Sequence, residues 1–293
     1  AAVGVSNQIL MFGMLLFNFV AMGSAVVVSQ YLGAGLRRDV GRLTGSSLAL
    51  NLLFGLFVSA MVVLFCGDLL RLFGLEPELH AIAQRYLLIA GGGLFVQAVM
   101  SAAVAIIQSH GLTRQTMFVA LGMNIIHIFG NYLVIFGPFG FPKLGVTGVA
   151  ISTVVSQVIG MIVNLYLLRR AVELPFTPRH LIRWKLDDVV RVLRVGVPAS
   201  LNNLSYNVNQ LVTTAMIASL GSVMLATRIY TMNINFIIVI LCISLGRGMQ
   251  IIVGHLVGAG EQDEAYRQVL RNYGRSVLIT LAGAAVICLL RVP

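Results

Sequence analysis

Long apolar runs alternate along this chain with short polar breaks. A helix needs about 20 residues to cross a hydrocarbon core of ~30 Å, and eight runs approach or exceed that length. They lie at 2–31, 43–66, 80–108, 115–136, 145–168, 197–219, 222–253 and 274–291. None alternates apolar and polar positions as the strands of a membrane barrel do. The pattern predicts an all-α integral membrane protein in which eight transmembrane helices form a bundle.

One stretch of this pattern occurs twice. Residues 23–42 read GSAVVVSQYLGAGLRRDVGR, and residues 248–267 read GMQIIVGHLVGAGEQDEAYR. In each copy an apolar run ends at Gly-Ala-Gly, and the register holds without a gap back to Ala1 and Ala226. Because glycine commonly ends a helix, we expect both copies to end a helix in the same way. We interpret them as parts of an internal repeat.

The repeat predicts helices on both sides of this sequence. The span at 197–219 precedes the second copy and has no counterpart before Ala1, where the chain starts inside a span and without Met. Completing each half from the other gives six spans per half and twelve in all. An even number makes the repeat parallel, with a substrate site between the halves. We expect an N-terminal lobe of five present helices at 1–168, a cytoplasmic linker at 169–195 and the first three helices of a C-terminal lobe at 196–293.

Composition and charge fit this class. Hydrophobic residues make up 58% of the chain and charged residues 10%, against about 25% charged residues in soluble domains. The net charge of +10 comes from basic residues between the apolar runs, so it indicates membrane orientation and no nucleic-acid partner is expected. Of 20 Lys and Arg residues, 14 fall on the side of the Gly-Ala-Gly turns. That side is predicted to be cytoplasmic.

The polar residues argue against an enzyme. All ten acidic residues lie in predicted loops or at span ends, whereas a membrane-embedded enzyme would need paired carboxylates, a His/Glu metal cluster or a Gly-x-Ser-x-Gly nucleophile. The three cysteines, Cys66, Cys242 and Cys288, have no metal-ligand spacing. We therefore expect no catalytic residue, no metal site and no cofactor.

Three motifs carry a resemblance to a known family. They are SQYLGAG, NYLVIFGPFGFPKLGVTGVAIST at Asn131 to Thr153, and GVPASLNNLSYNVNQ at Gly196 to Gln210. In this order and spacing they resemble the multidrug and toxic compound extrusion (MATE) transporters, and nearly the whole chain resembles that family's helices 2 to 9. The resemblance implies an antiporter that exports organic, often cationic, compounds against H⁺ or Na⁺. Its location would be the plasma membrane, which is the inner membrane if the cell is Gram-negative. We expect it to be a monomer.

A polar face on the span at 115–136 is the candidate cation-coupling site. Asn124, His127 and Asn131 are spaced i, i+3 and i+7, which places them on one helical face. Hydrogen bonding between helices would also explain them, but His127 adds a titratable group. Many members of the resembled family carry an aspartate where Asn131 stands. Because no predicted span holds a carboxylate near its middle, we expect H⁺ coupling through His127, alone or with an acid on a preceding helix, and Na⁺ stays open.

The spans at 197–219 and 222–253 hold the candidate substrate cavity. Two adjacent polar stripes on the first of them are too broad for one helix contact and predict a water-filled cavity. On the second, Arg228 is expected to reach the outer membrane surface, whereas Arg247 lies deeper. The cavity candidates are Asn202, Asn203, Tyr206, Asn209, Gln210, Arg247 and Gln250.

A lipid-linked saccharide flippase of the same superfamily is the alternative function. Arg247 would place a fixed positive charge in the cavity, which suits an anionic pyrophosphate lipid and disfavours cationic substrates. The motif at Asn131 to Thr153 favours the extrusion family instead.

Overall fold

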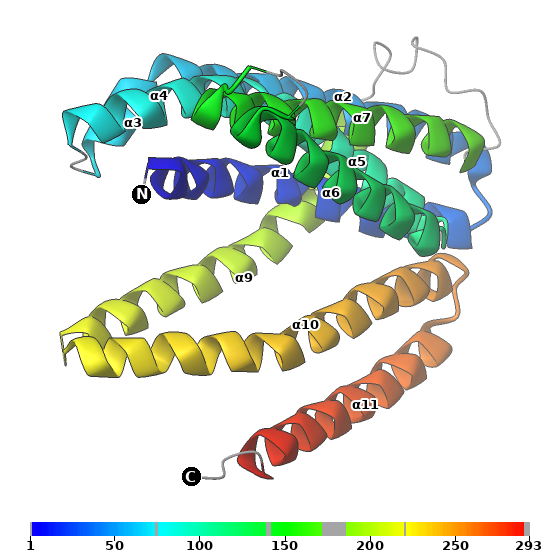
Figure 1. Ribbon diagram of the computed structural model, residues 1–293. Helices are drawn as coiled ribbons and strands as arrows, with labels where there is room; N and C mark the ends of the chain where they lie inside the picture. The colour runs from blue at the N-terminus through cyan, green and yellow to red at the C-terminus, as the bar shows by residue number, and fades with distance from the viewer. Residues whose placement is uncertain (1, 74–75, 139–141, 172–185, 220, 290–293) are drawn as a thin grey trace. The chain divides into compact units, whose positions relative to one another are not determined.

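The chain is helical throughout the described residues, which are 2–73, 76–138, 142–171, 186–219 and 221–289 of a computed structural model. Within these ranges it forms ten helices and no strand (Figure 1). They are α1 (Ala2–Gly33), α2 (Arg37–Leu64), α3 (Cys66–Arg71), α4 (Pro77–Gly92), α5 (Leu94–Ser109), α6 (Thr113–Phe136), α7 (Gly145–Ala171), α9 (Leu186–Ala218), α10 (Ser222–Gly258) and α11 (Gln262–Leu289). The predicted all-α class is confirmed.

Most of the predicted spans are single helices. Among the described residues, six helices are long and apolar enough to cross a membrane, or seven if α4 and α5 count as one span. These two helices form the run predicted at 80–108, but the chain bends by 42° between them. The bend lies at three consecutive glycines, Gly91 to Gly93. They favour a break because glycine weakens a helix.

The span predicted at 197–219 is part of a longer helix. α9 begins at Leu186, so the last residues assigned to the linker at 169–195 are helical and continuous with the span. Residues 172–185 of that linker lie outside the described residues, as do residues 139–141 of the motif at Asn131 to Thr153.

The contacts divide the chain into two compact units. The first contains Ala1–Val28 and Arg37–Val197, and the second contains Ser29–Leu36 and Pro198–Pro293. The division in α9 falls at Pro198, which lies inside the helix and removes one backbone hydrogen bond there. The lobe boundaries predicted at 168 and 195 stay predictions.

The start of α9 is held within the first unit by charge and by close packing. Asp188 is 2% exposed, and its Oδ2 accepts a hydrogen bond of 2.9 Å from Arg42 Nε on α2. Arg42 also contacts Asp39 at 2.8 Å. Further along, a Cβ on Gly196 would collide with the backbone carbonyl of Phe19 on α1. Both contacts act on the same end of α9.

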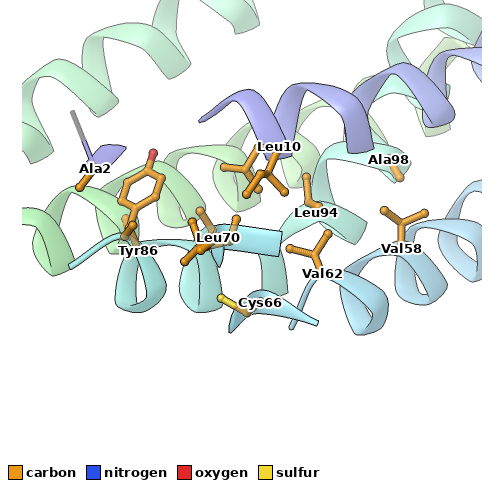
Figure 2. Packing of buried hydrophobic residues seen from close by; sticks show 14 of the residues in the cluster. Ala2, Leu10, Val58, Val62, Cys66, Leu70, Tyr86, Leu94 and Ala98 are labelled. Atoms are coloured by element: carbon orange, nitrogen blue, oxygen red, sulfur yellow. The ribbon is translucent and has the colours of Figure 1, made fainter. Parts of the chain in front are cut away.

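A hydrophobic core lies between α1, α2, α4, α5 and the short α3 in the first unit. Figure 2 shows Leu10 and Leu94 facing Val58, Val62 and Leu70 in this cluster. Helix association in lipid depends on close van der Waals packing, and small residues permit it here. A Cβ on Gly55 would stand 2.7 Å from Ala98 Cβ, so only glycine fits.

The two Gly-Ala-Gly turns fold identically. After α1, the amides of Ala34, Gly35 and Leu36 donate to the carbonyls of Gln30, Leu32 and Tyr31 at 2.9, 3.1 and 3.0 Å. After α10, the amides of Ala259, Gly260 and Glu261 donate to His255, Val257 and Leu256 at 2.9, 3.1 and 2.9 Å. Every donor and acceptor pair is related by the sequence repeat. The second glycine of each turn has a left-handed φ, 71° and 83°.

Candidate functional site

His127 lies at the centre of a polar cluster between α6 and α7. Its Nε2 is 3.1 Å from Thr153 Oγ1 on α7 and 3.2 Å from Asn131 Nδ2 on α6. Small residues allow the two helices to approach this closely. A Cβ on Gly148 would stand 2.6 Å from Val134 Cβ, so a larger residue would separate the helices and lengthen the contact between His127 and Thr153.

The hydrogen-bond directions in the cluster depend on the protonation of His127. The Asn131 amide nitrogen can only donate, so its bond to Nε2 requires an unprotonated Nε2. Thr153 gives its single hydrogen to the Val149 carbonyl at 2.8 Å, and its oxygen can accept from a protonated Nε2. A proton on Nε2 therefore exchanges the bond within α6 for one between α6 and α7.

The cluster continues to two further helices of the first unit. Tyr86 on α4 donates to Asn7 Oδ1 on α1 at 3.2 Å, and its hydroxyl lies near Thr153. Neither Asn7, Tyr86 nor Thr153 was among the residues predicted from sequence. Thr153 closes the motif that begins at Asn131, so the motif itself was a signal. The local sequence pattern around Asn7 and Tyr86 gives no signal that they belong to a site.

Two of the three predicted coupling residues come together. Asn131 lies beside His127, and its buried Oδ1 has no hydrogen-bond partner among the described residues. Asn124 is on the same helix but exposed, outside the hydrogen-bonded cluster. The site in the described chain is thus built on His127, Asn131 and Thr153.

A second polar cluster joins α9 and α10 in the second unit. Gln210 donates to the hydroxyl of Tyr206 at 2.9 Å. Arg228 on α10 donates to Gln210 Oε1 at 3.1 Å and to Thr214 Oγ1 at 3.3 Å. The expectation that Arg228 reaches the outer membrane surface stays a prediction; its guanidinium binds two neutral acceptors on α9.

Among the described side chains, no hydrogen bond joins the other predicted cavity residues to this cluster. Asn202 and Asn209 are exposed on α9, and Asn209 Oδ1 lies 3.4 Å from Thr213 Oγ1. The side chain of Asn203 lies outside the described residues. Arg247 is exposed and Gln250 half-buried; Arg247 is about 28 Å from Arg228 along α10 at 1.5 Å per residue. The structure therefore places the cluster near the start of α10.

No group of three or more His, Cys, Asp or Glu side chains suited to a metal occurs in the part of the chain that the structure describes. The chemistry available in the two clusters is proton exchange at an imidazole, amide and hydroxyl hydrogen bonding, and one fixed positive charge.

Comparison with known proteins gives concordant matches. The MatE family model matches residues 1–133 and 198–293. The uncharacterized transporter YisQ of Bacillus subtilis is 37% identical over 93% of this chain and 60% of its own length. A probable multidrug resistance protein NorM of Thermotoga maritima is 26% identical over 100% of this chain and 63% of its own length. This chain thus spans about three fifths of these relatives.

A solved structure shares the fold. A crystal structure of MATE in the bent conformation matches with a TM-score of 0.90 at 20% identity, covering 98% of this chain and 64% of that chain. At this identity the likeness concerns the arrangement of the helices alone.

Proposed function

Because the chain belongs to the MatE family of multi-pass membrane transporters, we propose that it is part of a secondary antiporter of the cell membrane. It exports organic, drug-like compounds by alternating access and takes its driving force from an inward flow of H⁺. Members of this family are transporters and not enzymes. The cation, the substrate and the transport cycle are the parts that need testing.

The observation that carries H⁺ coupling is the position of His127. It is the titratable member of a cluster that links α6 to α7, at 3.1 Å from Thr153. A driving ion shifts a conformational equilibrium only through a group whose binding differs between the two states. No carboxylate lies near the middle of a span in this sequence. His127 supplies such a group, because its imidazole can bind and release a proton at Nε2.

The hydrogen bonds suggest how a proton acts on the helices. In the tautomer of neutral His127 that carries its hydrogen on Nδ1, Nε2 accepts from Asn131 on the same helix. With His127 protonated, Nε2 donates to Thr153 on the neighbouring helix, and the Asn131 amide has to rotate or give up its bond. Protonation therefore strengthens the α6 to α7 contact, and proton release weakens it. A cycle that alternates between these two arrangements would couple proton flow to a movement of the helices.

The test is His127→Gln in the full-length transporter in proteoliposomes. Glutamine keeps a polar side chain of similar length but does not titrate. Substrate binding should survive, while efflux driven by a pH gradient should fall toward the level without a gradient, because glutamine cannot bind and release a proton. His80→Gln on α4, outside the cluster, is the matched control and should transport normally. Undiminished proton-driven efflux in the His127 variant would contradict the proposal.

Na⁺ coupling is the second candidate, and one atom favours it. The buried Oδ1 of Asn131 has no partner among the described residues, and Thr153 Oγ1 lies in the same cluster, so two oxygen ligands are available for a hard cation. Efflux from the same proteoliposomes under a Na⁺ gradient at equal pH on both sides distinguishes the ions. Transport in that condition alone would replace H⁺ by Na⁺.

The proposed substrate path follows the polar face of α9. Asn202, Tyr206 and Asn209 are exposed there, and the NorM relative is named a probable multidrug resistance protein. A flippase for lipid-linked saccharides is the competing function. Efflux of a fluorescent organic cation against movement of a labelled lipid between leaflets, measured in the same vesicles, decides between them.

A further inference from the structure

Arg228 on α10 is a half-buried charge with neutral neighbours. Its Nε donates to Thr214 Oγ1 at 3.3 Å and its Nη2 to Gln210 Oε1 at 3.1 Å. A guanidinium has five N–H donors, so three are left beyond these two bonds. The two acceptors orient the group without neutralising it.

No acidic residue of the second unit lies near this charge along the chain. After Pro198 the sequence contains only three carboxylates, Glu261, Asp263 and Glu264. They follow the far end of α10, about 45 Å from Arg228 along the helix at 1.5 Å per residue. None of the ion pairs between described residues involves Arg228.

A hollow of about 410 Å³ adjoins the guanidinium. Its lining residues are Ile217, Met224, Thr227, Arg228, Thr231 and Met232. The volume falls within the range of small-molecule sites, about 300–1,000 Å³. Apart from Arg228 and two threonines the wall is apolar, and methionine adapts to ligands of varied shape.

Thr227 and Thr231 do not donate hydrogen bonds into the hollow, so Arg228 is the donor among its lining residues. Thr227 Oγ1 donates to the Val223 carbonyl at 2.9 Å, and Thr231 Oγ1 donates to the Thr227 carbonyl at 2.8 Å. Each hydroxyl has a single hydrogen, which these bonds within α10 occupy. An anionic group in the hollow would therefore be recognised by the guanidinium, with its apolar part on the two methionines and Ile217.

We propose that this hollow binds amphipathic anions, with a carboxylate or phosphate group on Arg228 and the attached chain against the apolar wall. The site is independent of the coupling site at His127 and selects against cations of the same size. Two sources share this chemistry, the headgroup of an anionic phospholipid and a free amphipathic anion.

The test is binding of octyl phosphate to the purified full-length protein in a neutral maltoside detergent, measured by calorimetry. Octyl trimethylammonium has the same chain with the opposite charge and should not bind the hollow. Arg228→Gln should weaken octyl phosphate binding about tenfold or more, because hydrogen bonds to a charged group are the strong ones. Arg271→Gln, which removes an exposed charge on α11, should bind as the wild type does.

A second variant separates binding from folding. Ile217→Trp fills the hollow and leaves Arg228 in place, so it should also lose octyl phosphate while its thermal unfolding stays cooperative. Equal binding of octyl phosphate by both variants and the wild type would overturn the site, as would a loss of octyl trimethylammonium binding in the Ile217→Trp variant.

The lipid composition of nanodiscs distinguishes the two sources of the anion. In nanodiscs of phosphatidylglycerol, occupation by lipid would block octyl phosphate, whereas nanodiscs of phosphatidylcholine would leave binding intact. Binding in both lipids supports a free amphipathic anion. Inorganic phosphate serves as the headgroup alone and should bind far more weakly than octyl phosphate, because it has no chain for the apolar wall.

Discussion

At the scale of single residues, Thr153 decides what His127 can do. Its hydroxyl is the hydrogen-bond acceptor on α7 for a protonated imidazole on α6, and it is held in position because its own hydrogen goes to the Val149 carbonyl. A threonine in a membrane helix is otherwise unremarkable, since bonding to a carbonyl of the preceding turn is common. What distinguishes Thr153 is the partner that packing brings to it.

We predict that Thr153→Val reduces proton-driven efflux. Valine keeps the branched shape of threonine but cannot accept a hydrogen bond, so the protonated form of His127 loses its partner on α7. The measurement is efflux against internal pH in proteoliposomes. Thr153→Ser retains the hydroxyl and should keep the wild-type profile. A profile that is unchanged in the valine variant would show that Thr153 plays no part in coupling.

At the scale of helices, the repeat creates a reciprocal contact within the second unit. A Cβ on Gly33, at the end of α1, would collide with the His255 carbonyl, and a Cβ on Gly258, at the end of α10, would collide with the Gln30 carbonyl. The two collisions are equivalent under the repeat, and between them a Cβ on Gly254 would stand 2.6 Å from Ser29 Cβ. Gly-Ala-Gly therefore serves two purposes. Its first glycine permits the helix contact, and its second permits the turn.

We predict that Gly33→Ala and Gly258→Ala each destabilise the folded protein, by about 1–3 kcal/mol as for overpacked cores. The new methyl group meets backbone, which cannot rotate away. Thermal unfolding in detergent measures the change. In the double variant the losses should not add, because both act on one contact.

The matched control for these variants lies on the same helix. A Cβ on Gly248 of α10 has no atom within 4 Å, so Gly248→Ala should be neutral or stabilising, since alanine favours a helix by about 1 kcal/mol over glycine. If Gly33→Ala unfolds at the same temperature as Gly248→Ala, the close contact between the helix ends is not formed in solution.

At the scale of the whole molecule, orientation in the membrane follows from the distribution of basic residues. From the positive-inside rule we expect Arg38 and the link at 169–195 in the cytoplasm and Lys143 outside. In this orientation both Gly-Ala-Gly turns would lie on the cytoplasmic side. It does not depend on the helix packing, because it is set when the chain inserts.

We predict that single cysteines report this orientation. In a background without Cys66, Cys242 and Cys288, a cysteine at position 143 should react with a membrane-impermeant maleimide in intact cells. Cysteines at positions 38 and 183 should react only after lysis, because the membrane shields them. Mass shift on a gel measures the reaction. Labelling at 38 or 183 before lysis would reverse the orientation.

The sequence by itself determined the class of protein, the place of most helices, the repeat and its family. These follow from local properties: an apolar run of sufficient length must be helical in lipid, because its backbone polar groups have no other partner there. The equivalent bonds at the two Gly-Ala-Gly turns are local too, since each turn is built from its own residues. Such features can be read without knowing which helices touch.

Only the tertiary structure decided which polar residues meet. Spacing placed His127 and Asn131 on one face, but it also placed Asn124 there, and it could not bring Thr153 from the next helix to His127. Spacing along the chain also did not show that Arg228 binds Gln210 and Thr214 on α9. The reason is physical. Contacts between helices depend on how each is rotated and how closely it approaches its neighbour, and small residues such as Gly148 set both through packing with partners far away in the sequence.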